Sequence, residues 1–459
     1  MPARTRWPLL VLVAGLVVAA VVVALVIVDA RSHVAPALPA ATSGSSPRAT
    51  EAPALDDAFY ATRTPYPVPT SVPTAGPAGF EPVFLQHLGR HGARTATPAS
   101  DGEGAGRLWR RASREGALTP LGVQLGPALA TLDAATDRLG LGRLTTVGRQ
   151  EQEGLGRRTG TRLAGLWASA GESDEVDVVT SGRTRTKQSA QSFVAGLTAV
   201  EPGVRVERPR TDKRLLYFDT SDADYHAFLA GRAWRGPYAA ALRGTDLEAV
   251  SREVLERLYS PSFVASLHDP QKEAESLYER YRSAPSLSAD LRTPVDLAPF
   301  FPASAAAAFA FAEDARYFYS RGPGVTGDDR SHRAAQVLVD DFLASAGRRL
   351  AGGHTVAVLQ LAHAEEVAPL AALLELPGSR PLASAQQVYS WAGSDFRTAS
   401  VVPVSATIDW TVWRDSTGTV LVSVLENEVP TTLGRSCQEA AGVPGYYRLD
   451  ELRRCLAAR

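Results

Sequence analysis

The chain has 459 residues, of which 45% are hydrophobic and 21% charged. This composition is typical of a globular protein with one large core or more than one domain. The formal net charge is -1, so no overall field attracts nucleic acid or an acidic membrane surface. We therefore expect no nucleic-acid partner, and any site for an anion must be built locally.

An unbroken apolar run from Leu9 to Val28 follows two arginines at the start of the chain. A helix over this run is long enough to cross a membrane, and the preceding arginines favour a cytoplasmic start. We expect residues 1–29 to be a membrane anchor that leaves the rest of the chain outside the cytoplasm. Cleavage near Ala37 to Ala41 is the alternative, and it would make the protein secreted. Residues 30–79, rich in Pro, Ala, Ser and Thr, predict a tether.

The folded region begins with an apolar strand, predicted at Pro82 to Leu88, which leads into a turn that carries Arg90, His91, Gly92 and Arg94. An imidazole that is held neutral can attack phosphorus, and guanidiniums bind the oxygens of a phosphoryl group in transfer. A lone histidine at a strand end is more often structural, but the flanking arginines favour a catalytic role for His91.

After this turn, hydrophobic periodicity predicts helices and strands in alternation. This order indicates an α/β fold with a mostly parallel sheet flanked by helices. Helical patterns dominate residues 212–346, so we expect an inserted, mainly helical domain that divides the core into residues 80–211 and 347–459. Ligands of such sheets bind at the carboxyl ends of the strands, where the turn at His91 would meet the segment after a strand at Thr355 to Leu361. Other predicted elements are helices at Leu121 to Leu132, from Leu144 toward Leu166, at Ala190 to Leu197 and at Val367 to Leu374, and strands at Val176 to Thr180, Val401 to Val412 and Thr419 to Leu425.

Cys437 and Cys455 are the only cysteines. An even number of cysteines in an exported chain favours a disulfide, so we expect a bond between them that closes the C-terminal segment. Two buried thiols are the alternative. No metal-ligand spacing surrounds either cysteine.

Several motifs, taken in chain order, resemble those of the histidine acid phosphatases, and more narrowly the branch of multiple inositol polyphosphate phosphatases. The turn Arg90 to Arg94 is the first of them, and the triplet His363-Ala364-Glu365 follows the late strand. That branch carries His-Ala-Glu where most acid phosphatases carry His-Asp. Tyr217 is a departure, because relatives often have arginine there. The likeness covers about residues 80–456 and includes Leu144-Thr145 with Gly148, Ser181 with Arg185, Asp212 with Phe218, Glu313-Asp314 with Tyr317, and Asn427-Glu428.

The resemblance implies that His91 is a nucleophile that forms a phosphohistidine and that Glu365 is the general acid for the leaving group. For Arg185, the neighbouring Arg183 is the fallback. Glu366 is expected to be the partner of a helix dipole rather than the acid. The residues implied to bind the phosphoryl group are Arg90, Arg94, Arg185 and His363.

The implied partner is a small phosphorylated molecule, an inositol polyphosphate such as phytate, and we expect a monomer. No metal and no other cofactor is expected, because guanidiniums would supply the positive charge. A broad acid phosphatase, a phosphoglycerate-type phosphatase and a non-enzymatic envelope binding protein remain alternatives on the same fold. Arg210, Lys213 and Arg214 are either a solvated face or a rim that holds non-reacting phosphates.

Overall fold

The computed structural model describes residues 59–70, 76–97, 102–434 and 437–457, all of which belong to one compact unit, Leu55–Arg459. The apolar run from Leu9 to Val28, on which the expected anchor rests, lies outside the described residues. Within the described ranges, no helix is both long and apolar enough to cross a membrane.

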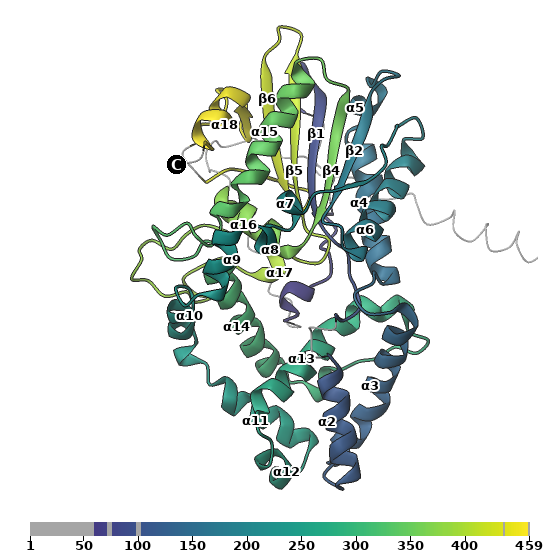
Figure 1. Cartoon of the computed structure of the whole chain (residues 1–459), viewed down its shortest axis with the longest axis vertical. Helices are drawn as coiled ribbons and strands as arrows, with labels where there is room; N and C mark the ends of the chain where they lie inside the picture. The colour runs from purple at the N-terminus through teal and green to yellow at the C-terminus, as the bar shows by residue number, and fades with distance from the viewer. Residues whose placement is uncertain (1–58, 71–75, 98–101, 435–436, 458–459) are drawn as a thin grey trace, which may run out of the picture. The chain divides into compact units, whose positions relative to one another are not determined.

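A single mixed sheet forms the upper half of Figure 1, with strand order β3-β2-β4-β1-β5-β6-β7 and with β8 paired to β6. Strands β1 to β4 pair in parallel, whereas β5 to β8 add to the sheet in antiparallel pairs. The sheet is therefore parallel only in the half that holds the predicted site, and not over most of its width. The strands are β1 (Phe80–Arg90), β2 (Glu175–Thr180), β3 (Arg210–Thr211), β4 (Thr355–Ala362), β5 (Thr407–Asp415), β6 (Val420–Glu426), β7 (Val429–Thr431) and β8 (Tyr446–Arg448).

Helices cover both faces of the sheet, which explains why β4 is an almost continuous run of buried apolar residues. Successive residues of β1 point to opposite faces, so Leu85 packs in the cluster with α4 and α6 while Phe84 packs in the cluster with α15 and α16. The helices on the two faces are α4 (Thr146–Arg162), α5 (Ala164–Ala168), α6 (Thr184–Val200), α15 (Gln336–Leu350), α16 (Ala364–Leu373) and α18 (Leu449–Cys455). The short helix α17 (Thr398–Val401) contacts η1 and α14 instead.

A second apolar cluster lies among the helices in the lower half of Figure 1. It draws on α2 and α3, which we had placed in the first part of the α/β core, as well as on α11 to α14. Conversely, the end of α14 and all of α15 pack against the sheet, so the helical part does not coincide with residues 212–346. Its helices are α2 (Gly102–Arg114), α3 (Pro120–Leu139), α11 (Leu247–Leu258), α12 (Pro261–Ala265), α13 (Pro270–Leu287) and α14 (Ala303–Arg321).

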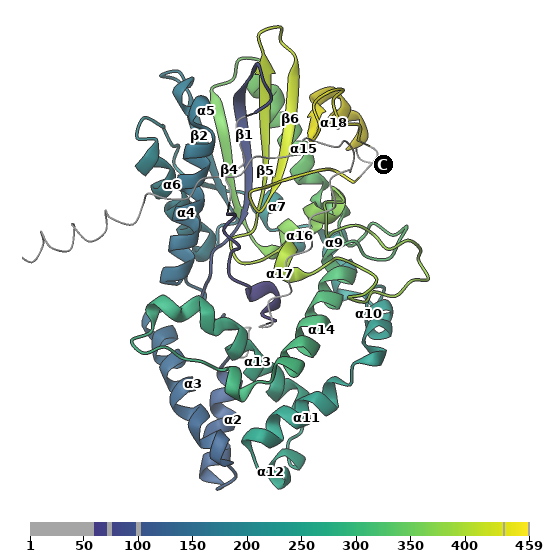
Figure 2. The same ribbon diagram turned by 180° about the vertical axis from the view of Figure 1, so that it is seen from behind.

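Four short helices connect the sheet to this helical part, namely α7 (Lys213–Leu216), α8 (Phe218–Ser221), α9 (Ala223–Ala230) and α10 (Arg235–Ala241). A 3-10 helix, η1 (Ala61–Arg63), precedes β1 and lies between the lower end of the sheet and the helices α13 and α14 in both views (Figures 1 and 2). Composition had assigned this segment to the tether, but all three of its residues are buried.

The C-terminal segment is closed by a disulfide between Cys437 and Cys455, whose Cα atoms are 5.3 Å apart. Both cysteines pack against the apolar cluster on the α15 face of the sheet. The bond therefore joins α18 to the loop that precedes β8.

Candidate active site

The parallel register of β1 and β4 brings two distant histidines together. Arg90 pairs with Ala362 at the carboxyl ends of these neighbouring strands, so the chain reaches His91 and His363 at the same edge of the sheet. Their ring centroids are 5.3 Å apart, with one ring edge-on to the other. The sheet thereby juxtaposes residues that lie far apart in the sequence.

The backbone determines which nitrogen of His91 can react. Its Nδ1 lies 3.0 Å from the carbonyl oxygen of Gly92, and because a carbonyl can only accept, Nδ1 must donate a hydrogen. Burial, together with the charges of Arg185, Arg90 and Arg94, holds the pKa of His91 well below its usual value. The ring is therefore neutral, with the lone pair on Nε2 available for attack.

Gly92 allows this turn to lie directly against the start of α4. A Cβ at Gly92 would overlap the carbonyl of Gly148, and a Cβ at Gly148 would overlap the carbonyl of Ala93. Thr145 caps α4 by accepting from Gly148 N at 3.1 Å, and its hydroxyl also donates to Ala93 O at 3.2 Å. Close backbone contact thus holds the turn that carries His91.

Three arginines lie around His91: Arg90 at the end of β1, Arg94 in the turn that follows, and Arg185 in the first turn of α6. Arg90, at the end of β1, donates from Nη1 to Thr62 O at 2.6 Å and also to Val402 O, and burial lowers its pKa to about 10. Burial and the neighbouring charges also lower the pKa of Arg94 and, by burial, that of Arg185. In each of the three, Nε is buried without a hydrogen-bond partner among the described residues. Clustered cations with unpaired donors favour an anionic ligand.

The two candidate arginines at the start of α6, Arg183 just before the helix and Arg185 in its first turn, have different environments. Arg185 has the largest charge effect on His91, whereas Arg183 is exposed and donates from Nη2 to the hydroxyl of Tyr217 at 2.8 Å. The Tyr217 ring in turn lies 5.1 Å from the ring of His363. Arg185 therefore fits the phosphoryl site, and Arg183 supports an aromatic wall beside it.

His363 is held by a serine from the neighbouring strand end. Its Nε2 lies 2.8 Å from the hydroxyl oxygen of Ser181. Burial and the charge of Arg185 lower the pKa of His363 to about 3, so this ring is neutral too. Its Nδ1 is buried without a partner among the described residues, which leaves one ring nitrogen to contact a ligand.

The two glutamates that follow His363 have different environments. Glu366 is fully buried and accepts from His363 N at 3.1 Å, as a residue that caps the start of α16 does. Glu365 keeps some exposure. Burial opposes its ionisation, but the charges of nearby groups, that of Arg321 above all and also that of Arg90, outweigh burial and lower its pKa to about 2. Burial raises the pKa of Glu366 well above its usual value, so Glu366 is a neutral cap and not the charged partner of the helix dipole that we expected, while the acid role of Glu365 stays a prediction.

Sequence reasoning missed Arg63 and Arg321, which no motif marked. Arg63, on η1, pairs with Glu279 at 2.6 Å, and its charge acts on Arg94 and Arg90. Arg321 ends α14 with its guanidinium 5.6 Å from the ring centre of Tyr317. The only available signal was indirect: Tyr317, four residues earlier, belonged to the family pattern.

The structure divides the predicted basic rim. Arg210 on β3 pairs with Asp177 on β2 at 2.9 Å, so its guanidinium already has a carboxylate partner within the sheet. Lys213 and Arg214 are exposed on α7, four and three residues before Tyr217. Only these two of the three rim candidates therefore remain available to a ligand near the site.

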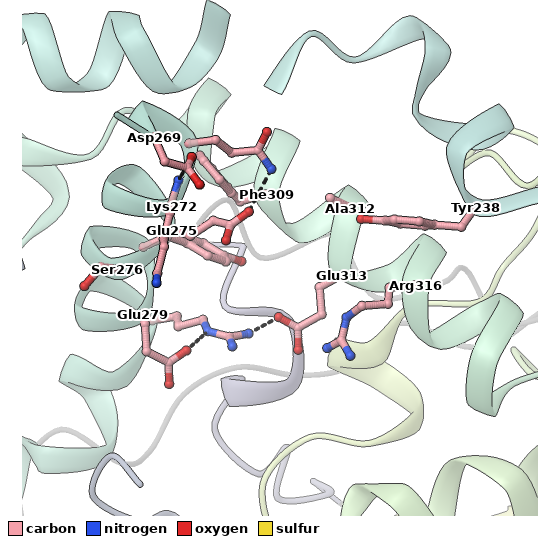
Figure 3. A pocket seen from close by; sticks show the side chains of 13 residues that line it. Tyr238, Asp269, Lys272, Glu275, Ser276, Glu279, Phe309, Ala312, Glu313 and Arg316 are labelled. Atoms are coloured by element: carbon pink, nitrogen blue, oxygen red, sulfur yellow. Dashed lines mark hydrogen bonds and ion pairs between the residues drawn. The ribbon is translucent and has the colours of Figure 1, made fainter. Parts of the chain in front are cut away.

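A cavity of about 670 Å³ opens between α13 and α14 in the helical part (Figure 3). Its lining mixes Lys272, Arg282 and Arg316 with four carboxylates, and Arg282 forms ion pairs with Glu279 at 2.6 Å and with Glu313. Because carboxylates balance the cations, this cavity is not an anion site. Among the described residues, no group of three or more His, Cys, Asp or Glu could hold a metal ion.

Comparison with known proteins agrees with this arrangement. The model of the histidine phosphatase superfamily (branch 2) matches residues 83–427. A multiple inositol polyphosphate phosphatase from Bifidobacterium longum, in complex with inositol hexasulfate, is 25% identical and superimposes with a TM-score of 0.80 over 87% of this chain and 97% of that one. A phytase from D. castellii shares the fold at 15% identity, with a TM-score of 0.64 over 88% of this chain and 86% of that one. No curated protein sequence matches.

Proposed function

Because the chain belongs to branch 2 of the histidine phosphatase superfamily and is a histidine acid phosphatase, we propose that it removes phosphate from inositol polyphosphates such as phytate through a phosphohistidine at His91. The observation that carries this proposal is the neutral His91 ring, 5.3 Å from His363 and surrounded by Arg90, Arg94 and Arg185. The Bifidobacterium longum relative, which binds inositol hexasulfate, supports the substrate class.

In the first step, His91 Nε2 attacks the phosphorus and the bond to the leaving oxygen breaks. The hydrogen bond from Nδ1 to Gly92 O stabilises the positive charge that develops on the ring. The three arginines and His363 bind the phosphoryl oxygens, whose charge spreads in the transition state. In the second step, water attacks the phosphohistidine, the P–N bond breaks, and phosphate leaves.

Glu365 moves the proton in both steps. An inositol alkoxide is a poor leaving group, so a proton from Glu365 should accelerate its departure by roughly 10² to 10⁴. The resulting carboxylate then takes a proton from the attacking water. The low pKa of Glu365, about 2, means that this residue must gain its proton as the substrate binds. A phosphate group placed among the arginines favours this, because its negative charge opposes ionisation of Glu365.

Replacement of Glu365 by Gln tests the acid role. We expect Glu365→Gln to slow hydrolysis of inositol hexakisphosphate and of glycerol phosphate by roughly 10² or more. Hydrolysis of nitrophenyl phosphate should fall much less, because nitrophenolate leaves without a proton. Comparison of kcat for both substrate types measures this, and equal losses on both would remove Glu365 from the acid role.

Two further measurements test the nucleophile and the substrate class. His91→Ala should abolish turnover on both substrate types, and a rapid quench without acid should trap phosphate on His91 of the active protein. A higher kcat/KM on inositol hexakisphosphate than on small monoesters supports the inositol polyphosphate assignment. The reverse preference would favour a broad acid phosphatase on the same fold.

A further inference from the structure

One peptide group separates the ring of His91 from a carboxylate on α4. The Gly92 carbonyl, which accepts from His91 Nδ1 at 3.0 Å, belongs to the same peptide as the N–H group of Ala93. Ala93 N donates to Glu151 Oε2, also at 3.0 Å. This peptide is trans, so its C=O and N–H groups point in opposite directions. The imidazole, the peptide and the carboxylate therefore form one continuous chain of hydrogen bonds.

A buried serine just before β5 holds this carboxylate against the turn. The Ser405 hydroxyl donates to the same Glu151 oxygen at 2.9 Å and accepts from Gln152 Nε2 at 3.0 Å. Ser405 N donates to His91 O at 3.2 Å, and Gln152 Nε2 also donates to Arg90 O at 3.0 Å. Ser405 is fully buried and has a φ of 61°, a left-handed conformation that is uncommon for serine. The network thus fixes the direction of the carboxylate relative to the nucleophile.

The charge of Glu151 depends on a balance between burial and these hydrogen bonds. Burial raises the pKa of Glu151 above its usual value. The groups that oppose this rise are the Ala93 and Tyr66 amides, the Ser405 hydroxyl and the Arg90 guanidinium. Glu151 therefore loses its charge in acid more readily than an exposed glutamate does, and an effect of that charge is best measured at neutral pH.

The proposed chemistry creates a positive charge at the other end of this chain. When Nε2 of His91 bonds to phosphorus while Nδ1 keeps its hydrogen, the ring becomes a cation. The Gly92 carbonyl accepts from that cation, and a negative charge beyond the peptide polarises the carbonyl and strengthens its hydrogen bond. A carboxylate that contacts a catalytic imidazole directly stabilises its charged form. Here the same effect would pass through one peptide group.

We propose that Glu151 is a positioning residue that acts on His91 through the Gly92–Ala93 peptide and stabilises the cationic phosphohistidine. This inference rests on the proposed function. In the first step the P–N bond forms, the bond to the leaving oxygen breaks, and the ring gains its positive charge. In the second step water attacks phosphorus, the P–N bond breaks, and its electron pair returns to Nε2, so the ring is neutral again. Glu151 neither gains nor loses a proton in either step.

Glu151→Gln tests this role, because the amide oxygen can still accept from Ala93 N and from the Ser405 hydroxyl while the charge is gone. Labelled nitrophenyl phosphate at neutral pH, a rapid quench without acid and a chase with unlabelled substrate give the rate constants for formation and hydrolysis of the phosphohistidine. Formation should slow and hydrolysis should accelerate, because the cation is less stable in the variant. We expect the ratio of the two rate constants to fall about tenfold.

A merely structural role for Glu151 would give a different result, since a displaced turn slows both steps. Ser405→Ala shows this case: it removes one hydrogen bond of the network but keeps the charge, so it should not change the two rate constants in opposite directions. Glu153→Gln is the matched control, because it removes a carboxylate from the same helix in an exposed pair with Arg157. Both rate constants should stay unchanged in that variant.

Only slower formation together with faster hydrolysis in Glu151→Gln supports the inference, and any other combination overturns it. Should Glu151→Gln not fold, Glu151→Asp decides by the same criterion, with a smaller fall in the ratio, because its carboxylate is one methylene group farther from Ala93 N. Failure of the proposed function looks different. If the unaltered protein yields no phosphate on His91, the proposed function itself is wrong, whereas trapped phosphate with an unchanged ratio in the variant removes only the role of Glu151.

Discussion

At His91, one backbone carbonyl decides which ring nitrogen can react. The contact from Nδ1 to Gly92 O depends on the path of the turn, which in turn depends on a glycine-to-glycine contact with the start of α4. The reactivity of the side chain is therefore a property of the backbone around it. Residues that do not contact the phosphate group can therefore affect the reactivity of His91 through the backbone of this turn.

Gly92→Ala tests this dependence. The new methyl group would overlap the carbonyl of Gly148, so the turn must shift away from α4. We expect a loss of stability of about 1–3 kcal/mol and a fall in kcat of at least tenfold, measured by urea unfolding and by turnover of nitrophenyl phosphate. Gly203→Ala is the control, since a Cβ there meets nothing within 4 Å. An active, equally stable Gly92→Ala variant would contradict the argument.

Sequence reasoning identified the residues that carry local patterns and missed those that do not. His91 stands between two arginines after a strand, so the residue types of that turn indicated phosphoryl transfer. The role of Glu365 came from the resemblance of its triplet to that of the histidine acid phosphatases. Arg63 and Arg321 stand alone in segments without a chemical pattern, and only tertiary folding brings their charges to the site. Spacing within the family pattern favoured Arg185 over Arg183, but it could not reveal the hydrogen bond between Arg183 and Tyr217, which is a contact between distant segments.

At the scale of elements, the parallel strands were the most predictable part of the fold. β4 is an almost continuous apolar run, which is typical of a strand covered on both faces, and β2 ends in buried apolar residues. Whether a strand runs parallel or antiparallel to its neighbour depends on long-range pairing, and β5 joins β1 in the opposite direction. For the same reason, periodicity identified helices but not their partners, and it could not show that α2 and α3 pack with α11 to α14.

The helix α7 permits a test of the polyphosphate rim. Lys213 and Arg214 are exposed and close in sequence to Tyr217 at the site wall. We expect the double variant Lys213→Ala and Arg214→Ala to raise KM for inositol hexakisphosphate about tenfold, because it removes two attractive charges, while KM for nitrophenyl phosphate stays unchanged. Arg208→Ala, an exposed change in the same basic segment, is the control. Equal effects of both variants would indicate a solvated face.

At the scale of the whole molecule, one buried polar group ties the middle of the sheet to α4. Asp409 on β5 accepts from Arg162 at 2.7 Å and lies 2.6 Å from Nδ1 of His87 on β1, and all three side chains are at most 5% exposed. Burial opposes ionisation of Asp409, but His87 and Arg162 outweigh burial and keep its pKa below the usual value. A buried charge with these partners stabilises the fold only while all of them are present.

Asp409→Asn should destabilise the protein by about 3–5 kcal/mol at pH 7, because it leaves the Arg162 charge buried without a counter-charge. Urea unfolding measures the loss. Since the folded pKa of Asp409 is depressed, its contribution is present above the unfolded value of about 4 and is lost as pH falls through the folded value. Arg111→Gln, which breaks the exposed pair with Glu115, should cost less than about 1 kcal/mol. Similar losses in both variants would contradict the distinction.

The position of η1 limits how far the protein can be shortened. Thr62 O accepts from the guanidinium of Arg90, Arg63 pairs with Glu279, and Phe59 stacks on Trp391 at 5.9 Å. A recombinant fragment that began at β1 would retain every motif by which the family is recognised and yet lack one wall of the reaction centre. We therefore expect such a fragment to lose its turnover of nitrophenyl phosphate, although it contains all of residues 83–427, which the family model matches.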